Sequence, residues 1–202
     1  MHKLGLQAVQ AKSYKRTHQA RQPYRDTIKS NVLGREFSAN RPNRKWVCDI
    51  TYIALRQGWL YLSIVMDLYS RAIVGWSMGC RPSKGLVSRA LAMAFEMRRP
   101  KPGLVLHSDQ GVQYSSRSYL QEAESYGFIV SMSRRGNCYD NAVAESFFHT
   151  LKAELVRNRV FSTASEAKQT LFKYIEIFYN RQRLHSTIGY QPPLEYEALG
   201  VA

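Results

Sequence analysis

The sequence is short of acidic residues, cysteine and long apolar runs. Its 202 residues hold 15 Asp and Glu against 29 Lys and Arg, so the net charge of +14 points to an anionic partner. No stretch reaches the roughly 18 apolar residues of a membrane helix, and no signal-peptide core is present. The three cysteines match no zinc spacing and fit a reducing cytosol: Cys48, Cys80 and Cys138. We therefore expect a cytoplasmic protein with no membrane partner.

Several catalytic motifs are also missing. The sequence has no G-x-S-x-G and no Cys–His pair suited to nucleophilic catalysis. It has no P-loop or other glycine-rich nucleotide fingerprint, so ATP is not implied. The apolar content of 45 % and the 13 tyrosines are typical of a globular protein, and the length suits one domain with appendages.

The basic excess lies at the N-terminus. Residues 1–45 hold 11 Lys and Arg against 2 Asp and Glu, which accounts for +9 of the net charge. Tyrosines are interleaved with these cations and no amphipathic apolar face is present, so nucleic acid is favoured over an anionic membrane. A merely solubilising tail is the other reading. The cations that we expect to contact DNA phosphates include Lys12, Lys15 and Arg16.

The order of elements predicts an α/β fold. After a short helix and an extended arm, the pattern gives three antiparallel strands at 46–55, 59–66 and 72–77, with further strands at 104–107 and 128–131. Helices are predicted at 83–97, 116–126, 140–158 and 164–179. The succession β-β-β-α-β-α-β-α requires parallel crossovers in its second half, which is the ribonuclease H-like arrangement of a mixed five-stranded sheet flanked by helices. We divide the chain into a basic arm (1–45), a catalytic core (46–160) and a C-terminal helix with a tail motif (161–202).

Three acids occupy comparable places in this order. Asp49 lies within the first strand, Asp109 closes the fourth strand before a turn at Gly111, and Glu145 projects from the polar side of the helix that follows the fifth strand. Taken singly, each has an ordinary explanation: an outward-facing strand carboxylate, a turn former and a solvated helix face. If the first and fourth strands are neighbours, the three carboxylates meet. Clustered carboxylates repel one another unless a cation neutralises them, which indicates Mg²⁺ or Mn²⁺. We expect two such ions, which can activate a hydroxyl and stabilise a leaving oxygen of a phosphodiester.

Three segments carry a resemblance to a known family. Trp46-Val-Cys-Asp49-Ile-Thr-Tyr-Ile, His107-Ser-Asp109-Gln-Gly111-Val-Gln-Tyr-Ser and Asp140-Asn-Ala-Val-Ala-Glu145-Ser-Phe-Phe resemble the three signatures of the retroviral-integrase-like DDE transposases of bacterial insertion sequences. The 35 residues between Asp109 and Glu145 match the spacing of that family. A segment at 179–193 is similar to the one that ends the catalytic half of its split-frame members. The resemblance implies that Asp49, Asp109 and Glu145 are the catalytic metal ligands.

The resemblance also bears on the basic residues near these acids. Lys152, seven residues after Glu145, matches a basic position that the family places near the DNA end. His149 is either a polar-face residue or an assistant near the scissile strand, and His107 either orients Asp109 or packs within its strand.

Four more polar residues receive predictions from the sequence. Arg183 and His185 either hold phosphates just beyond the active site or dock the tail on the core. Asp140 is predicted to cap the helix that carries Glu145, and Asp67 to lie in a turn.

The implied activity is cleavage of DNA at insertion-sequence ends, followed by strand transfer of the freed 3′ hydroxyl. The implied partners are double-stranded DNA at terminal repeats and target sites, further copies of the chain assembled on that DNA, and a DNA-binding protein read from an upstream frame. Family members carry helix-turn-helix segments upstream, so we expect an N-terminally truncated, catalytic-half chain associated with the nucleoid. Two alternatives remain: a ribonuclease H-like nuclease, and a non-catalytic DNA-binding transposase remnant.

Overall fold

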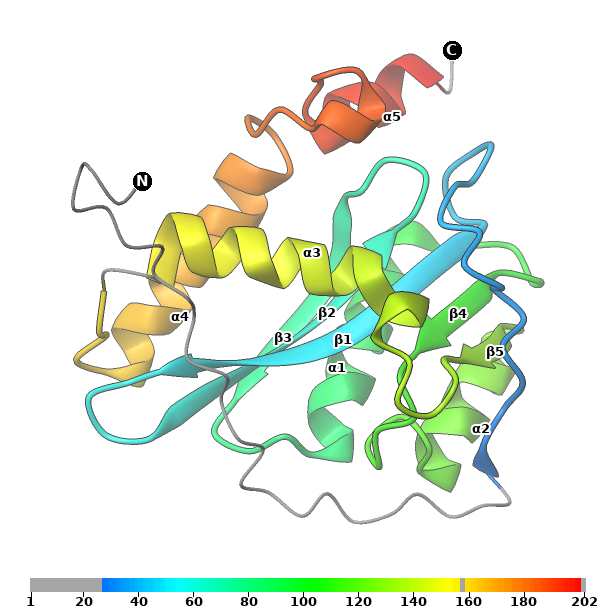
Figure 1. The fold of residues 1–202 in the computed structure, drawn as a ribbon, viewed down its shortest axis with the longest axis horizontal. Coiled ribbons are helices and arrows are strands. Elements are labelled where there is room, and N and C mark those ends of the chain that lie inside the picture. Colours follow the sequence, from blue (N-terminus) through cyan, green and yellow to red (C-terminus); the bar gives the residue numbers. More distant parts are fainter. Residues whose placement is uncertain (1–26, 157–158, 201–202) are drawn as a thin grey trace, which may run out of the picture.

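A computed structural model describes residues 27–156 and 159–200, and a five-stranded mixed sheet forms its centre (Figure 1). The strand order is β3-β2-β1-β4-β5, with β1 antiparallel to β2 and parallel to β4. The strands are β1 (Lys45–Ala54), β2 (Trp59–Asp67), β3 (Ile73–Gly79), β4 (Val105–Ser108) and β5 (Ile129–Met132). The predicted meander and parallel crossovers are confirmed, and the first and fourth strands are neighbours.

Helices cover both faces of the sheet. Helices α1 and α2 lie on one face, while α3 and α4 lie on the other (Figure 1). Two of them begin as the sequence suggests, because the side chains of Ser83 and Thr163 accept the N–H groups of Leu86 and Glu166. The helices are α1 (Lys84–Arg98), α2 (Arg117–Ser125), α3 (Ala142–Leu151), α4 (Ala164–Phe172) and α5 (Pro193–Gly200).

Short non-α turns join these helices. A 3-10 turn at Cys138–Asn141 precedes α3, and a π-helical turn at Lys152–Val156 follows it. A second π-helical turn, Lys173–Tyr179, continues α4 over the rest of its predicted length, and a 3-10 turn at Ser186–Ile188 comes before α5. The predicted helix of residues 140–158 is thus α-helical only in its middle, and the helix α5 was not predicted.

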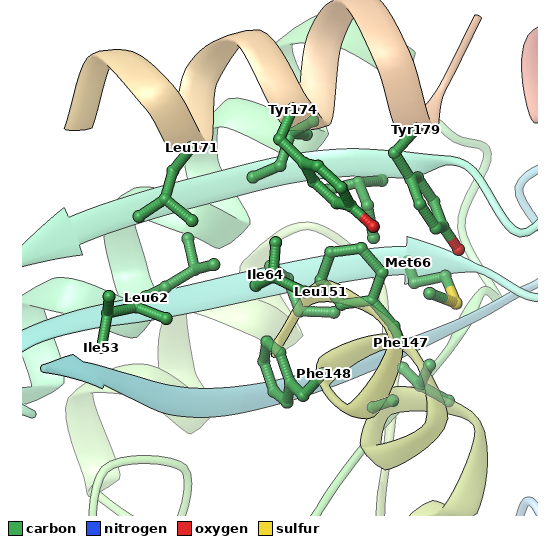
Figure 2. Close-up of a cluster of buried hydrophobic side chains, with 14 of the residues drawn as sticks. Ile53, Leu62, Ile64, Met66, Phe147, Phe148, Leu151, Leu171, Tyr174 and Tyr179 are labelled. Atoms are coloured by element: carbon green, nitrogen blue, oxygen red, sulfur yellow. The ribbon is translucent and has the colours of Figure 1, made fainter. Parts of the chain in front are cut away.

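The core on the α3 side fixes the orientation of that helix. Phe147, Phe148 and Leu151 point from α3 toward the sheet, into a buried cluster with strand residues Ile64 and Met66, as Figure 2 shows. Each large apolar side chain buried in this way contributes about 1.5–3 kcal/mol. Because one stripe of α3 is held against the sheet, the opposite stripe with Glu145 faces outward.

The other face of the sheet packs closely against α1. Gly75 on β3 lies so near this helix that an added Cβ would come within 2.3 Å of the Ala90 carbonyl oxygen and 2.7 Å of the Ala94 Cβ. Around this contact lies a second buried cluster, which includes Trp46 and Phe128 with their rings edge to face at 5.6 Å. Glycine is therefore the residue that lets α1 approach the sheet.

Residues 28–37, which we call the strap, run along β5 at the edge of the sheet. The Leu33 N–H donates to Ser131 Oγ at 3.0 Å, and the Met132 N–H donates to the Ser30 carbonyl at 3.3 Å. Lys29 forms an ion pair with Glu124 of α2 at 2.8 Å. Residues 1–26 of the predicted arm, with its short helix, Lys12, Lys15 and Arg16, lie outside the described residues. Within residues 27–156 and 159–200 no helix has the length and apolar character to cross a bilayer.

Candidate active site

Asp49 lies on the face of β1 that α3 covers. Side chains alternate along a strand, and Asp49 shares its face with Val47 and Ile53, which belong to the cluster under α3. Its Oδ1 accepts the N–H of Ile50 at 2.7 Å. Burial and the negative charge of Asp109 raise the pKa of the Asp49 carboxyl to about 8. A carboxyl in this state holds its proton at neutral pH.

Asp109 follows the last residue of β4. The parallel register pairs Val47 of β1 with His107 of β4, so Asp49 and Asp109 each lie two residues beyond the same pair. The exposed Asp109 side chain is turned by the loop: its Oδ1 accepts the Gly111 N–H at 2.9 Å. An added Cβ at Gly111 would lie 2.8 Å from that oxygen, so glycine leaves room for this conformation.

Glu145 is exposed on the outer side of α3. Its negative charge also raises the pKa of Asp49, and the positive charge of Lys152 lowers it. Acids from β1, from the loop after β4 and from α3 therefore lie within electrostatic reach of one another. These three elements are far apart in the sequence, and the sheet order brings them together.

The donor set suits a hard divalent cation, since all three side chains offer carboxylate oxygens. In the part of the chain that the structure describes, however, no three His, Cys, Asp or Glu side chains converge closely enough to hold a metal ion. Burial raises the pKa of Asp49, and repulsion from the negative charge of Asp109 raises it further. A divalent cation bound between the carboxylates would offset this repulsion and favour their charged forms.

Lys152 lies at the end of α3, on the same side as Glu145. Its Nζ is 4.6 Å from the centroid of the Tyr52 ring, and its charge acts on Asp49. Burial lowers the pKa of the half-buried Lys152 amine and Asp49 raises it. Tyr52 in turn meets Trp59 edge to face at 5.0 Å. Tyr52 was not singled out from the sequence, where a tyrosine in a strand is unremarkable.

The two histidines of the site differ in environment. His149 is exposed on α3, which fits a polar-face residue, and a role near the scissile strand stays a prediction. His107 is fully buried, and its Nδ1 lies 2.8 Å from Ser131 Oγ. Burial lowers the pKa of His107 to about 4, against the opposing effect of the Asp140 backbone beside it. The hydrogen bond of its Nδ1 is thus to β5, which supports the packed alternative over one in which it orients Asp109.

The prediction that Asp140 caps the helix is wrong. The residue before α3 is Asn141, which makes no side-chain capping bond, and Asn137 caps the preceding 3-10 turn. Asp140 is buried instead, where it forms ion pairs with Arg35 at 2.7 Å and Arg134 at 3.0 Å. The sequence gives no signal for these partners, because Arg35 is 105 residues away.

Asp67 does lie at a turn, as predicted. Its Oδ1 accepts the N–H of Tyr69, two residues on, at 2.8 Å. Its Oδ2 accepts the Asn43 N–H at 2.7 Å and the indole N–H of Trp46 at 3.1 Å. The carboxylate therefore also ties the start of β1 to the end of β2.

Arg183 and His185 hold the tail on the core. Arg183 pairs with Glu154 of the π-helical turn after α3 at 2.8 Å, and the Tyr174 hydroxyl donates to the same carboxylate at 2.7 Å. His185 lies edge to face with the Tyr179 ring at 4.7 Å. Burial, with the charges of Arg183 and Arg71, lowers the pKa of His185 to about 4, so the imidazole is neutral at pH 7. These contacts favour the docking alternative, and a phosphate contact for either residue stays a prediction.

Comparisons with known proteins agree with this geometry. Residues 39–138 and 145–199 each match a family described as integrase core domain. The chain is 43 % identical over 197 residues to the transposase for insertion sequence element IS904 of Lactococcus lactis, covering 98 % of this chain and 77 % of that protein. It is 42 % identical over 175 residues to the transposase InsF for insertion sequence IS3A of Escherichia coli, covering 87 % of this chain and 61 % of that protein.

A solved structure supports the fold independently. The catalytic core domain of the HTLV-2 integrase, solved with magnesium in a dimeric form, superposes with a TM-score of 0.55 at 14 % identity, covering 78 % of this chain and 97 % of that one. At this identity the likeness shows a shared ribonuclease H-like architecture. With the matched family and the two transposases, it leads to one assignment: the chain belongs to the insertion-sequence transposases that carry an integrase core domain.

Proposed function

We propose that the chain is a catalytic core that cuts DNA at the ends of an insertion sequence and transfers the freed 3′ hydroxyl to a second DNA site. The observation that carries the proposal is the sheet register, which pairs Val47 with His107 and so brings Asp49 and Asp109 to the same place on neighbouring strands. Burial and the charges of Asp109 and Glu145 raise the pKa of the Asp49 carboxyl, which supports it. Perturbed carboxyls of this kind are characteristic of functional sites. Transesterification exchanges one phosphodiester for another, so no energy cofactor is required.

Asp49, Asp109 and Glu145 would hold the divalent cation. Bound there, Mg²⁺ or Mn²⁺ would polarise a phosphodiester and lower the pKa of an attacking water or hydroxyl, and we propose two ions. The side chains of this chain prepare the site in two ways. Asp49 gives up its proton to become a ligand, and the Gly111 N–H holds one oxygen of Asp109 in place.

Lys152 would bind a phosphate or base at the DNA end. The ring of Tyr52 holds its ammonium near the site. Most other contacts would be to phosphates, which position DNA without reading its sequence. In this proposal Lys12, Lys15 and Arg16 of the basic arm contribute to them, and His149 assists near the scissile strand.

The same proposal names the partners. The substrate would be double-stranded DNA, comprising terminal repeats and target, held by several copies of the chain together with a DNA-binding protein from an upstream frame. The division into a basic arm (1–45), core (46–160) and C-terminal helix with tail (161–202) belongs to this proposal. A chain working on such DNA would be found with the nucleoid.

The test is a strand-transfer assay. The purified chain is incubated with Mn²⁺ and a pre-cleaved duplex end that carries a free 3′ hydroxyl, beside Glu145→Gln. Glu145 is exposed, so the variant should keep its fold. Glu96→Gln is the matched control, because Glu96 is an exposed glutamate of α1 on the other side of the sheet. We expect joined product from the wild type and from Glu96→Gln, and none from Glu145→Gln.

Two other outcomes would count against the proposal. Joining by Glu145→Gln at the wild-type rate would remove Glu145 from the chemistry. Hydrolysis of strands without joining would favour the nuclease alternative. The comparisons favour neither that alternative nor the non-catalytic remnant, since they match transposases over most of the chain.

A further inference from the structure

Asp140 is a buried acid that the proposed chemistry does not use. Both of its oxygens are occupied by hydrogen-bond donors. Oδ1 accepts from Arg35 Nε at 2.7 Å and from an Arg134 terminal nitrogen at 3.0 Å. Oδ2 accepts from Asn31 at 3.1 Å, and from the Nε and backbone N–H of Arg134 at 3.0 and 2.9 Å. A buried carboxylate with this many donors has little freedom to move.

The donors come from two segments that are distant in sequence from each other. Asn31 and Arg35 belong to the strap, and Arg134 lies two residues after the end of β5. Asp140 itself lies in the 3-10 turn that leads directly into α3. The carboxylate therefore joins the strap, the β5 exit and the first turn of the helix that carries Glu145.

The same group of contacts reaches the strand that carries Asp109. Ser131 of β5 accepts the Leu33 N–H and lies 2.8 Å from His107 Nδ1, and the backbone of Asp140 lies beside the same imidazole. His107 is two residues before Asp109 in the sequence. The segments that carry Asp109 and Glu145 thus meet at the buried imidazole of His107, which contacts the Ser131 hydroxyl and the backbone of Asp140.

The exposure of the charged groups around Asp140 indicates that a substitution of this residue acts locally and not on the whole fold. Asp140 has no exposed side-chain area, whereas the side chains of Arg134 and Arg35 are 62 % and 42 % exposed. If the carboxylate is neutralised, both guanidinium groups can turn into water without leaving a buried charge. The principal consequence is then the release of the first turn of α3 and not the loss of the fold.

We propose that Asp140 is a positioning residue, which fixes Glu145 relative to Asp109 through its contacts with Arg35 and Arg134. The inference rests on the proposed function. Glu145 follows Asp140 by five residues, so a shift or rotation of the first turn moves its carboxylate directly. A misplacement of about 1 Å in a reacting constellation can cost about 100-fold in rate. The strap, through Arg35, becomes part of the support of the active site.

The experiment compares Asp140→Asn with the wild type in the full chain. Mn²⁺ affinity is measured by calorimetry without DNA, and joining of a pre-cleaved end is measured at saturating Mn²⁺ below the melting temperature of each variant. We expect Mn²⁺ affinity and kcat to fall roughly 10- to 100-fold, as for residues that orient metal ligands, while KM for DNA changes little. Arg134→Ala should show the same pattern with a smaller loss, since Arg35 still holds the carboxylate.

Glu197→Gln is the matched control. Glu197 of α5 is also a partly buried carboxylate, paired with Arg98 of α1 and accepting the Ser70 hydroxyl at 2.8 Å. Its loss should lower the melting temperature without changing Mn²⁺ affinity or kcat. If Asp140→Asn behaves like Glu197→Gln, Asp140 is merely structural and the inference is overturned. If Asp140→Asn does not fold, Arg134→Ala decides in the same way, because Arg134 is largely exposed.

The two proposals can fail separately. A wild type that joins DNA, with Asp140→Asn and Arg134→Ala showing unchanged Mn²⁺ affinity and kcat, overturns the positioning role and leaves the proposed function standing. A wild type that binds Mn²⁺ but joins nothing counts against the proposed function, and the Mn²⁺ affinities of the variants still test the positioning role. A wild type that neither binds Mn²⁺ nor joins DNA overturns both.

Discussion

The ammonium of Lys152 lies over the ring of Tyr52, with 4.6 Å between its Nζ and the ring centroid. The two residues come from different elements. Lys152 follows the last residue of α3, and Tyr52 lies on β1 three residues after Asp49. An aromatic face attracts a cation, so the ring limits where the flexible lysine side chain can place its charge. Tyr52 therefore acts on the proposed DNA contact through its ring contact with Lys152.

Replacing Tyr52 by Ala should reduce strand joining more than replacing it by Phe. A cation–π contact of this kind contributes about 0.5–1 kcal/mol, which corresponds to a roughly two- to fivefold loss of rate in the Ala variant. Phe keeps the ring face and should stay near the wild-type rate. Initial rates at limiting DNA concentration measure the difference. Equal rates for the Phe and Ala variants would show that the ring does not position Lys152.

The stability of the metal-free chain should depend on pH through Asp49. Its folded-state pKa of about 8 exceeds the ordinary value of 3.8, so the folded state binds more protons than the unfolded state between these values. The free energy of unfolding must then fall as the pH rises through this window. In urea titrations with a chelator, we expect Asp49→Asn to be more stable than the wild type by about 1–3 kcal/mol near pH 8 and by much less near pH 5. A stability difference between the two proteins that is the same near pH 5 and near pH 8 would contradict the raised pKa of Asp49.

Arg183→Ala should weaken the fold but not the electrostatic part of DNA binding. Its ion pair with Glu154 and the Tyr174 hydroxyl bond are partly buried, so we expect a loss of about 0.5–1.5 kcal/mol in the free energy of unfolding. A residue that binds a phosphate would instead reduce the slope of log K against log salt by about 1. DNA binding titrated over a range of salt concentrations separates the two roles. Glu154→Gln is a useful companion, because it breaks the same ion pair without removing a cation.

Gly75→Ala should be among the most damaging single methyl additions in the chain. The new Cβ would lie 2.3 Å from the Ala90 carbonyl oxygen, so β3 and α1 would have to separate. Overpacking of this kind costs about 1–3 kcal/mol or more. Gly85→Ala, near the start of α1, is the control, since its Cβ would meet the flexible end of Arg89 at 3.5 Å and Ser83 Oγ at 3.9 Å, both ordinary van der Waals contacts. Equal urea midpoints for the two variants would show that the sheet and α1 can move apart easily.

The sheet and its order could be predicted from the sequence because strand and helix periodicities are local. Short turns after β1 and β2 require antiparallel neighbours, and strand–helix–strand connections require parallel ones. Only Asp49 is unusual within its own element, so the acids at residues 109 and 145 stand out through the predicted neighbourhood of the first and fourth strands and through the family's motifs and 35-residue spacing. The strands and the outward-facing side of α3 could therefore be predicted from the sequence alone.

Contacts between distant segments could not be predicted in the same way. Asp140 resembles a helix cap because aspartate is common before helices, yet its true partner Arg35 is brought to it by the strap. The sequence predicts a longer helix than α3 because the π-helical turn after Leu151 has the same amphipathic composition as an α-helix. The sequence gives no helical signal for α5, because residues 193–200 show little difference between an apolar and a polar face.

The ladder between β1 and β4 is short, joining only residues 45–47 to 105–107. Beyond Val47, β1 continues for seven residues with β2 as its only partner strand, while β4 ends at Ser108 (Figure 1). The ladder between β1 and β4 thus ends at Val47 and His107. Asp49 and Asp109 lie just past this end, Asp49 on β1 and Asp109 after β4. A sequence change that extended the ladder by two residue pairs would join the backbones of these two residues and fix the spacing of their carboxylates.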